Sequence, residues 1–595
     1  MKRFQQAGLG LYIASLLLFI ALLFFSRYEV TEARLDQIDP YLKSEHVEFV
    51  RPALASLKGQ EYGVKFSYIS RVKSALDDAD RAIAEQYGVS AEAQAQAIAI
   101  IREHTGSEYA LSEATREKAL EVIPEDLRQT VRDYTGWLIG RAFGSEAQFL
   151  QNVEEGIRNA VQGAVGSRQL SAYDREEYLF QIAKYTAGGL YWEHSFLFFF
   201  LVFGIGTLGA LMWIFPAFFD GMPGIKHNGI YHSSAMSRGV VGMMLGAFLV
   251  AFYLLLYFHH YYLAEWITLI DPFSQVLKGT PADRWFMYGF LYTISVLVMG
   301  IRMFTKYRHS KYHLVRTASV MFFQTGFAFI FPQILYRLKL PSQDIKNIWP
   351  LDYSFFFDYR LDELAAGGVI GYWMLGWGIA LFLVGVPAFT YFYGKRWYCS
   401  WVCGCGGLAE TLGDPWRQLS DKSLKAWKFE RIFIHSILVF SVVMTGLVLY
   451  TYFSGSSTVL GLNSYTVRGW YGLYVSSWFA GVIGTGLYPL LGNRPWCRFA
   501  CPLAAYLGIV QRFQSRFRIT TNGGQCISCG NCSTYCEMGI DVRAYAQRGQ
   551  NIVRASCVGC GVCAAVCPRG VLSLENLDDA GDSRMEVRYP DQVQG

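Results

Sequence analysis

The first 398 residues contain no cysteine, although the whole chain has 13. Disulfides and cysteine-held metal sites are therefore excluded from that part of the chain. Charge is scarce as well, since 17% of residues are Asp, Glu, Lys or Arg while 52% are apolar. No basic cluster with interleaved aromatic residues appears, which argues against a nucleic-acid partner. In a chain of 595 residues, this composition is typical of a membrane protein with several domains.

Eight apolar runs are long enough to cross the hydrocarbon core of a bilayer, about 30 Å thick. They cover residues 8–26, 195–219, 239–260, 285–303, 315–336, 368–392, 432–453 and 470–491. The first run follows Met1-Lys2-Arg3, as the apolar part of a signal peptide would. No small-x-small cleavage site comes after Phe25, so we expect an uncleaved anchor.

Lysine and arginine in the short loops predict the orientation. Segment 302–316 has five basic residues and no acid, and 394–431 has seven against four, whereas 261–284 has two against three. We therefore expect the N-terminus, 220–238, 304–314, 394–431 and everything after 492 to face the cytoplasm, with 27–194 outside. Every cysteine then faces a reducing compartment. The prediction is a multi-pass protein of a bacterial-type inner (cytoplasmic) membrane, in contact with the lipid bilayer.

Residues 27–194 differ from the rest in being charged and rich in Ala, Glu, Gln and Arg. Apolar residues recur at helical spacing around Ala75, Ala82 and Ala97, and Ser112 and Pro124 begin sequences typical of helix starts. We expect a helical bundle here. It either senses or docks an outer partner or only packs, and the sequence leaves both open.

The strongest motif is a pair of identical cysteine frames near the C-terminus, each with the spacing C-x2-C-x2-C-x3-C. In two-cluster ferredoxins, the first three cysteines of a frame hold one [4Fe–4S] cluster and the fourth ligates the other. We therefore predict two clusters, one on Cys526, Cys529, Cys532 and Cys567 and one on Cys557, Cys560, Cys563 and Cys536. Zinc ribbons rarely use two such frames, so zinc is the weaker interpretation.

A second cysteine motif occurs twice, each time directly after an apolar run. Residues 394–403 read GKRWYCSWVC and residues 492–501 read GNRPWCRFAC. Both copies lead to a similar hexapeptide, at 408–413 and 503–508. We infer that the two helix–motif segments are repeats, related to each other by a pseudo-two-fold axis.

If the two copies face each other, five thiols converge at the membrane surface: Cys399, Cys403, Cys405, Cys497 and Cys501. Such a set predicts an extra metal or redox site, for which Cu(I) and an Fe–S cluster are the soft-ligand choices. Arg396 and Arg494 would favour the thiolate form. The alternative is that these are small, buried cysteines that pack helix ends.

Three histidines, His194, His259 and His260, lie at the ends of two apolar runs, on the side expected to be outer. A bis-histidine haem needs two ligands at one depth, and this trio could supply them. The alternative is that they are polar anchors at the interface. The chain has no C-x-x-C-H haem site and no recognisable Thr-linked flavin motif, so nothing else indicates haem or flavin.

The membrane runs, the two C-x3-C motifs and the double cysteine frame together resemble the NosR/NapH/CcoG group of membrane polyferredoxins, over roughly residues 366–570. The resemblance implies a redox role, because members supply electrons to respiratory reductases or reduce copper during oxidase maturation. The chain departs from the group in two places. Gly404 follows Cys403 where proline is usual, and Glu537 follows Cys536. NosR-like members also carry an outer flavin domain, which residues 27–194 do not resemble.

The leading hypothesis is a membrane-anchored electron carrier, which passes electrons from a cytoplasmic donor to a membrane or outer redox partner. The donor would be a flavodoxin, a ferredoxin or a reductase. Arg543, Arg548, Arg554 and Arg569 would attract it if it is acidic, or would form only a solvated basic surface. One alternative is a copper reductase or maturation factor that uses the membrane-side thiols. A redox sensor ranks lower, since only residues 571–595 follow the last frame.

The expected fold class is a mainly α membrane protein with about eight transmembrane helices, a helical extracytoplasmic domain and a C-terminal α+β two-cluster ferredoxin-like domain. The expected boundaries are an anchor at 1–30, the outer domain at 31–190, the membrane bundle with both C-x3-C motifs at 191–515, the ferredoxin domain at 516–580 and a flexible tail at 581–595.

Overall fold

A computed structural model describes residues 2–87, 89, 91–104, 109–219, 232–394, 396–459 and 461–576. The predicted tail, 581–595, lies outside the described residues, and so do residues 220–231 of the predicted cytoplasmic loop. The chain divides into two compact units. One, the membrane unit, comprises Met1–Phe19, Ser195–Phe258 and Trp266–Gly595, and the other comprises Ile20–His194 and His259–Glu265.

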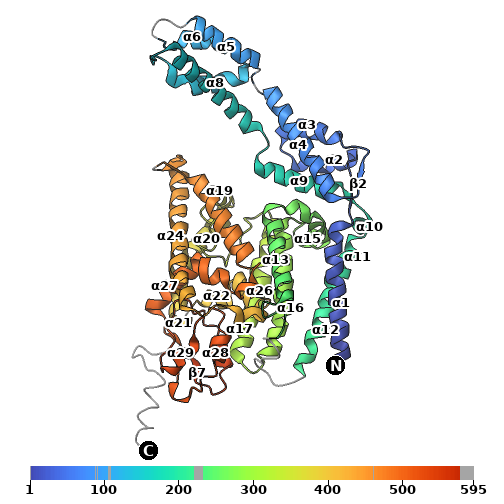
Figure 1. The fold of residues 1–595 in the computed structure, drawn as a ribbon, viewed down its shortest axis with the longest axis vertical. Coiled ribbons are helices and arrows are strands. Elements are labelled where there is room, and N and C mark those ends of the chain that lie inside the picture. Colours follow the sequence, from blue (N-terminus) through green and yellow to red (C-terminus); the bar gives the residue numbers. More distant parts are fainter. Residues whose placement is uncertain are drawn as a thin grey trace, which may run out of the picture. The chain divides into compact units, whose positions relative to one another are not determined.

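Seven helices of the described chain are long and apolar enough to cross a membrane, as the predicted fold class requires (Figure 1). They span Lys2–Phe24, Ser195–Phe218, Val240–Phe258, Arg284–Lys306, Lys311–Arg337, Gly368–Tyr393 and Leu424–Ser454. These spans are built on α1 (Lys2–Ala21), α11 (Ser195–Phe199), α12 (Ile205–Ile214), α13 (Val240–Phe258), α16 (Arg284–Lys306), α17 (Lys311–Phe322), α18 (Phe331–Arg337), α20 (Gly368–Ala380), α21 (Val386–Tyr393) and α24 (Leu424–Ser454). They match the first seven predicted runs.

The eighth predicted run, 470–491, is different. A helix begins with α25 (Ser464–Trp470), continues as the π-helix η10 (Tyr471–Ile483) and stops before the short α26 (Tyr488–Leu491). It is not apolar enough to count among the seven spans. Its ring contacts, such as Phe433–Phe479 and Phe440–Tyr471, place it beside α24. The expected number of about eight is therefore seven by composition, with this helix as a further membrane-unit element.

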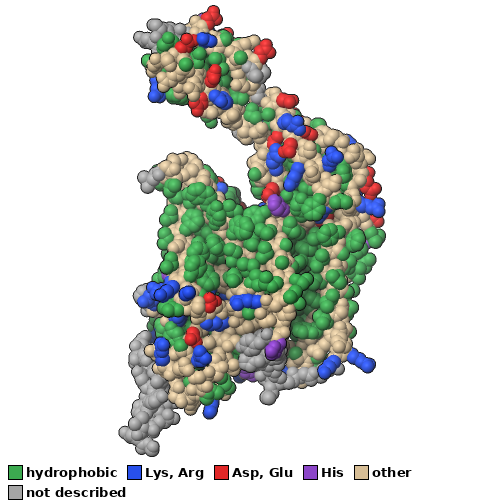
Figure 2. All heavy atoms as spheres, in the orientation of Figure 1, with side chains coloured by type: hydrophobic (Ala, Val, Ile, Leu, Met, Phe, Trp, Pro, Cys, Tyr) green, Lys and Arg blue, Asp and Glu red, His purple; other side chains and the backbone are tan. Residues whose placement is uncertain are grey.

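The outer surface of the membrane unit has the character of a lipid-facing surface. Figure 2 shows hydrophobic side chains over the flanks of its long helices, with Lys and Arg gathered toward the end that carries the ferredoxin elements. Many large apolar side chains are exposed on these helices, including Val369, Leu383 and Ile432. In water such a patch would be costly, so the pattern indicates a bilayer around the helices.

The C-terminal ferredoxin module is built on a two-stranded antiparallel sheet, β6 (Phe517–Thr521) with β7 (Leu572–Asn576), in which Ile519 faces Leu574. Its helices are short: α28 (Asn531–Thr534), α29 (Val542–Gln547) and α30 (Val562–Ala565). One buried core joins Ile519 and Val558 of this module to Ile434 and Met444 of α24. The module is therefore packed onto the membrane helices rather than tethered to them.

The remaining elements of the membrane unit connect and cap the spans. They are α14 (Ala264–Leu269), α15 (Asp271–Leu277), α19 (Asp358–Ala366), α22 (Trp397–Trp401), α23 (Gly404–Glu410), α27 (Pro502–Gln514) and the small pair β4 (Thr458–Val459) and β5 (Leu462–Asn463). The last three helices carry or follow the C-x3-C motifs.

The second unit is helical, as predicted, with a small sheet that the sequence analysis did not foresee. Its helices are α2 (Glu32–Ile38), α3 (Ser44–Ala55), α4 (Lys65–Tyr87), α5 (Ala91–Glu103), α6 (Glu113–Leu120), α7 (Glu125–Thr135), α8 (Glu146–Arg168), α9 (Ala172–Thr186) and α10 (Leu190–Glu193). The strands pair in the order β2 (Glu61–Tyr62), β1 (Arg27–Glu29), β3 (Ala187–Gly188). Ser112 caps α6 by accepting a hydrogen bond from the Thr115 amide, and α7 follows Pro124.

Candidate functional site

The cysteines of the two C-terminal frames lie around two separate cavities. One cavity is lined by Cys526, Cys529, Cys532 and Cys567, and the other by Cys536, Cys557, Cys560 and Cys563. Each cavity thus combines three cysteines of one frame with the fourth of the other. This is the crossed grouping that the spacing predicts for two [4Fe–4S] clusters.

The backbone repeats the same local geometry in both frames. Gly530 and Gly561 adopt left-handed φ values of 80° and 75°, and a short helix starts directly after each. The fourth sulfur of each frame accepts a backbone hydrogen bond four residues on, from Ile540 to Cys536 at 3.4 Å and from Val571 to Cys567 at 3.3 Å. Amide donors at the sulfurs stabilise anionic thiolate ligands and influence the reduction potential of the cluster that they hold.

The two C-x3-C motifs face each other at the junction between the membrane helices and the ferredoxin module. Cys399, Cys403, Cys497 and Cys501 are buried, and Cys405 is partly buried. Burial raises the pKa of Cys399 and of Cys501, and the neighbouring thiols of the other motif add to both shifts. A hydrogen bond from Cys405 lowers the pKa of Cys403 to about 6. The convergence predicted from the repeat is thus present.

The loop that carries three of the second cavity's cysteines is held by the first C-x3-C motif. Ser400 donates to the Val558 carbonyl at 2.6 Å, and the Arg396 side chain donates to the Ala555 carbonyl at 2.9 Å. Tyr312, on α17, donates to the Gly559 carbonyl at 2.7 Å. The second cavity is therefore the one adjacent to the membrane-side thiols.

A buried ion-pair network lies at the same junction. The carboxylate of Glu410 accepts hydrogen bonds of 2.7 to 3.0 Å from the side chains of Arg316, Arg417 and Arg494. Glu537 lies 2.9 Å from Arg417 and 3.1 Å from Arg494. Arg417 also lies 3.3 Å from Asp414, which pairs with Arg302 and Lys306. Five cationic side chains thus surround three carboxylates, and this excess of positive charge suits an adjacent anionic cluster.

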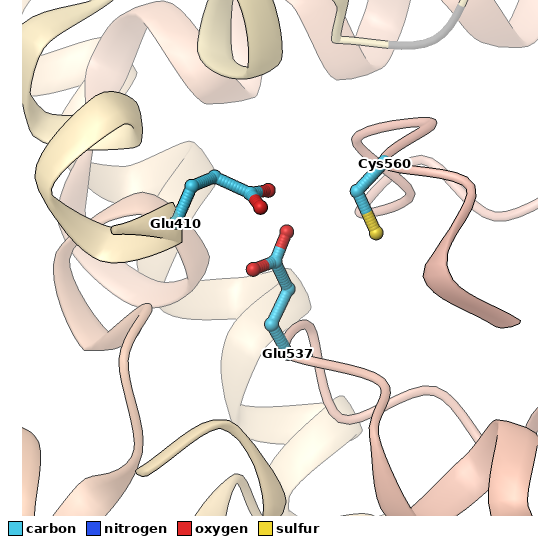
Figure 3. A group of neighbouring side chains, drawn as sticks. All are labelled: Glu410, Glu537 and Cys560. Atoms are coloured by element: carbon cyan, nitrogen blue, oxygen red, sulfur yellow. The ribbon is translucent and has the colours of Figure 1, made fainter. Parts of the chain in front are cut away.

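Figure 3 shows the carboxylates of Glu410 and Glu537 pointing toward each other, with the Cys560 sulfur alongside. These three groups offer ligand atoms within 4.8 Å of one another. A cation bound there would compete with the guanidinium groups that already contact both carboxylates, so the group is better explained as part of the ion-pair network. Burial alone would raise the pKa of Glu410, but Arg316, Arg417 and Arg494 hold it well below its usual value. Burial raises the pKa of Glu537 despite its two arginines.

Sequence reasoning missed the roles of Glu410, Arg316 and Arg417. Glu410 had a signal, because it stands in the repeated hexapeptide where the second copy has Ala505. A charged residue that only one copy of a repeat contains indicates a role that the other copy does not share. Arg316 is one of the basic residues that predict the orientation, and its partner in the fold is 94 residues away in the chain.

The first cavity lies at the exposed side of the module. Cys529 is exposed, and Ile527 beside it is 55% exposed. Arg543 and Arg569 line the same cavity and are exposed. Arg554 is partly buried, and its guanidinium stacks 4.2 Å from the ring centre of Trp427.

An apolar cavity of about 580 Å³ lies within the membrane unit. Residues of α1, α12, α13 and α16 line it, together with Leu408 of the first motif's helix and Tyr488. Leu408 lies five residues after Cys403, so the cavity reaches the helix that follows the first C-x3-C motif.

The predicted haem ligands are not gathered into a site of this kind. His194 and His259 are exposed, and His259 contacts the Tyr261 hydroxyl at 3.1 Å. His260 is buried, 3.8 Å from Glu177 and beside the Phe180 ring. A haem on these residues remains a sequence prediction without added support.

Comparison with family models gives two matches within the membrane unit. Residues 525–572 match a 4Fe-4S dicluster domain. Residues 375–425 and 474–520 both match a 4Fe-4S binding domain, so one description fits both copies of the inferred repeat. No solved structure matches the chain.

Three curated proteins are similar to part of the chain. The putative electron transport protein YccM of Escherichia coli K12 is 27% identical over 157 residues, 25% of this chain and 43% of that protein. The ferredoxin-type methylamine utilization protein MauN of Methylobacillus flagellatus is 28% identical over 25% of this chain and 51% of its own length. MauN of Methylorubrum extorquens is 27% identical over 34% and 66%. The match thus spans less than two thirds of each relative. These relatives support a general role in iron–sulfur electron transport. They do not confirm that the chain is of the NosR/NapH/CcoG type.

Proposed function

We propose that the protein is a membrane-anchored electron carrier with two [4Fe–4S] clusters in its ferredoxin module. Electrons enter at the cluster on Cys526, Cys529, Cys532 and Cys567 and pass to the cluster on Cys536, Cys557, Cys560 and Cys563. They then reach the membrane-side thiol site, and from there a membrane or outer redox partner. When bound, the clusters supply one-electron chemistry. The cysteines of the two cavities would hold them, with the exposed Cys529 at the first cavity and the buried Cys557 and Cys563 at the second.

The order of the two clusters between donor and acceptor is inferred from one observation. The loop of the second cavity is bound by Arg396 and Ser400 of the first C-x3-C motif, while the first cavity has the exposed Cys529. A carrier needs one cluster that a soluble donor can approach and another close to its acceptor. Both cysteine-lined cavities belong to one small module, which supports two clusters held close together.

The positive-inside pattern supports a cytoplasmic position for the ferredoxin module and an extracytoplasmic one for residues 27–194. The contact between Arg396 and Ala555 requires the 394–423 segment and the module to share one side. The donor is then a cytoplasmic flavodoxin, ferredoxin or reductase, and the acceptor is a membrane or outer protein or carrier. The resemblance to the NosR/NapH/CcoG group is consistent with this assignment.

The test is anaerobic purification of the full chain, followed by assay of iron and acid-labile sulfide and by EPR during stepwise reduction. At least eight iron atoms per chain are expected, since each cube holds four. Rapid mixing with reduced flavodoxin should reduce the cluster that Cys529→Ser removes before the one that Cys560→Ser removes. Reproducible iron near four per chain, or the opposite order of reduction, would overturn the proposal.

A further inference from the structure

The four cysteines of the two C-x3-C motifs form one group rather than two. All four belong to one buried core cluster, and the Arg494 side chain joins the two motifs by donating to the Cys399 carbonyl at 3.1 Å and contacting the Cys497 sulfur at 3.8 Å. Cys405 has no counterpart in the second copy, where Pro502 and Leu503 follow Cys501. The shared group is therefore Cys399, Cys403, Cys497 and Cys501.

The two halves of this group are built alike. The second cysteine of each motif is the residue before a helix, Cys403 before α23 and Cys501 before α27. Each sulfur accepts a backbone hydrogen bond three residues on, from Gly406 to Cys403 and from Ala504 to Cys501. Amide donors at this position stabilise a thiolate. The Arg494 guanidinium adds a contact at 3.8 Å to the Cys497 sulfur.

The separation of the sulfurs distinguishes the metals that could bind. Around a single tetrahedral ion with metal–sulfur bonds of about 2.3 Å, the sulfurs lie roughly 4 Å apart. Within the described chain, the one group of three metal-ligating side chains within 4.8 Å is Glu410, Glu537 and Cys560, so no three of these four sulfurs are that close. Among the described residues, no three sulfurs of the ferredoxin frames form such a group either, since Cys560 is grouped there with two carboxylates. A cube holds its four cysteines farther apart than a single ion does, because iron atoms and sulfides lie between them.

We propose that Cys399, Cys403, Cys497 and Cys501 together hold a third [4Fe–4S] cluster, shared between the two repeats at their pseudo-two-fold axis. Cys405 is not a ligand, and its thiol hydrogen-bonds to Cys403. The inference rests on the proposed function and deepens it, since these four cysteines would hold a one-electron acceptor next to the cavity lined by Cys557, Cys560 and Cys563. It makes the carrier a three-cluster relay and disfavours a single copper ion at these thiols.

The experiment measures iron, acid-labile sulfide and copper per chain in the anaerobically purified full-length protein, together with its Mössbauer spectrum. About 12 iron atoms and 12 sulfides are expected in the wild type, since three cubes hold four of each. The double variant Cys399→Ser/Cys497→Ser removes one ligand from each repeat. Its iron content should be about four atoms per chain lower than that of the wild type, and the EPR signals of the other two clusters should remain. Cys405→Ser is the matched control and should keep the wild-type count.

The outcomes separate the two proposals. About eight iron atoms in the wild type, with two cubes by Mössbauer, would overturn the third cluster and leave the two-cluster carrier standing. One copper per chain that is lost in the double variant would also overturn it. Fewer than eight iron atoms would count against the proposed function itself. The wild-type count decides even if the double variant fails to fold.

Discussion

Arg396 and Arg494 make reciprocal hydrogen bonds across the two repeats. Arg396 donates to the Cys497 carbonyl at 2.9 Å, and Arg494 donates to the Cys399 carbonyl at 3.1 Å. The two arginines occupy the same place in their motifs, three residues before the first cysteine. Each repeat therefore fixes the backbone of the other repeat's first thiol, as a pseudo-two-fold arrangement requires.

The two arginines should nevertheless differ in importance. Arg396→Gln removes charge-assisted hydrogen bonds to backbone carbonyls, which are worth about 1.5–3 kcal/mol each. Arg494→Gln also removes a cation from the buried Glu410 and Glu537, and breaking one side of a buried ion pair costs about 3–5 kcal/mol. We expect the midpoint temperature of the detergent-solubilised protein to fall further for Arg494→Gln.

Arg518→Gln, on β6 in the same module, provides the control and should change stability little, since among the described residues its side chain hydrogen-bonds to the adjacent Phe517 carbonyl alone. Equal losses for Arg396→Gln and Arg494→Gln would show that the carboxylates do not depend on Arg494.

The sequence allowed prediction of those parts of the site that depend on spacing or repetition. The crossed cysteine grouping follows from two equal frames, and the meeting of Cys399 with Cys497 follows from two equal motifs. The partners of Glu410 were not predictable, because Arg316 and Arg494 are distant in the chain and their pairing depends on how α17 and α23 pack. The small β1–β2–β3 sheet was missed for a related reason, since its strands have two or three residues and carry too little pattern.

The crossed ligation of the two ferredoxin clusters can be tested by single variants. Cys567→Ser should remove the same EPR signal as Cys529→Ser, although the two residues belong to different frames. Cys536→Ser should likewise match Cys560→Ser. The measurement is low-temperature EPR of the dithionite-reduced protein with iron analysis, and each variant is expected to lose at most about four iron atoms. If Cys567→Ser instead matched Cys560→Ser, each frame would hold its own cluster.

Glu537 should lower the reduction potential of the cluster on Cys560. Its carboxylate lies within the 4.8 Å group that includes the Cys560 sulfur, and a nearby negative charge disfavours adding an electron. Glu537→Gln should therefore raise the midpoint potential of this cluster, on the order of 50 mV for one charge screened by its arginines. Potentiometric EPR titration gives the value for each cluster.

Glu430→Gln is the matched control for this shift. Glu430 is also a buried carboxylate, paired with Arg498 at 2.9 Å, but it lies outside the Cys560 group. A larger shift from Glu430→Gln than from Glu537→Gln would show that the network acts through the fold rather than through charge at the cluster.

The start of α9 should lose stability in acid. Asp174 accepts hydrogen bonds from Ser171 and from Lys43, at 2.7 and 2.9 Å. Burial opposes its ionisation, but these contacts lower its pKa below 3.8. A lowered folded-state pKa contributes stability that is complete above the unfolded value and is lost as pH falls through the folded value. Asp174→Asn should therefore destabilise this helix end by about 1 kcal/mol near pH 7, with the difference from wild type shrinking below pH 3.8.

Amide hydrogen exchange at Asp174–Glu177 in the full chain, corrected for intrinsic rates, measures this effect. Asp78→Asn is the control, since Asp78 is exposed and its one observed partner is the exposed Arg81. A difference between Asp174→Asn and wild type that stayed constant from pH 7 to pH 3 would contradict the assigned pKa shift.

The first ferredoxin cavity should be where an acidic donor binds. Arg543 and Arg569 line it, and the exposed Ile527 beside Cys529 adds an apolar contact. Opposite charge steers association, so the double variant Arg543→Glu/Arg569→Glu should slow reduction by acidic flavodoxin about 10-fold or more at low salt. The difference from wild type should shrink as salt screens the charges, because the Debye length falls to about 3 Å at 1 M. Stopped-flow bleaching of the cluster absorbance gives the rate.

Arg81→Glu/Arg102→Glu changes the net charge equally in the other unit and should leave the rate unchanged. Equal slowing by both pairs would mean that flavodoxin responds to total charge and not to this surface.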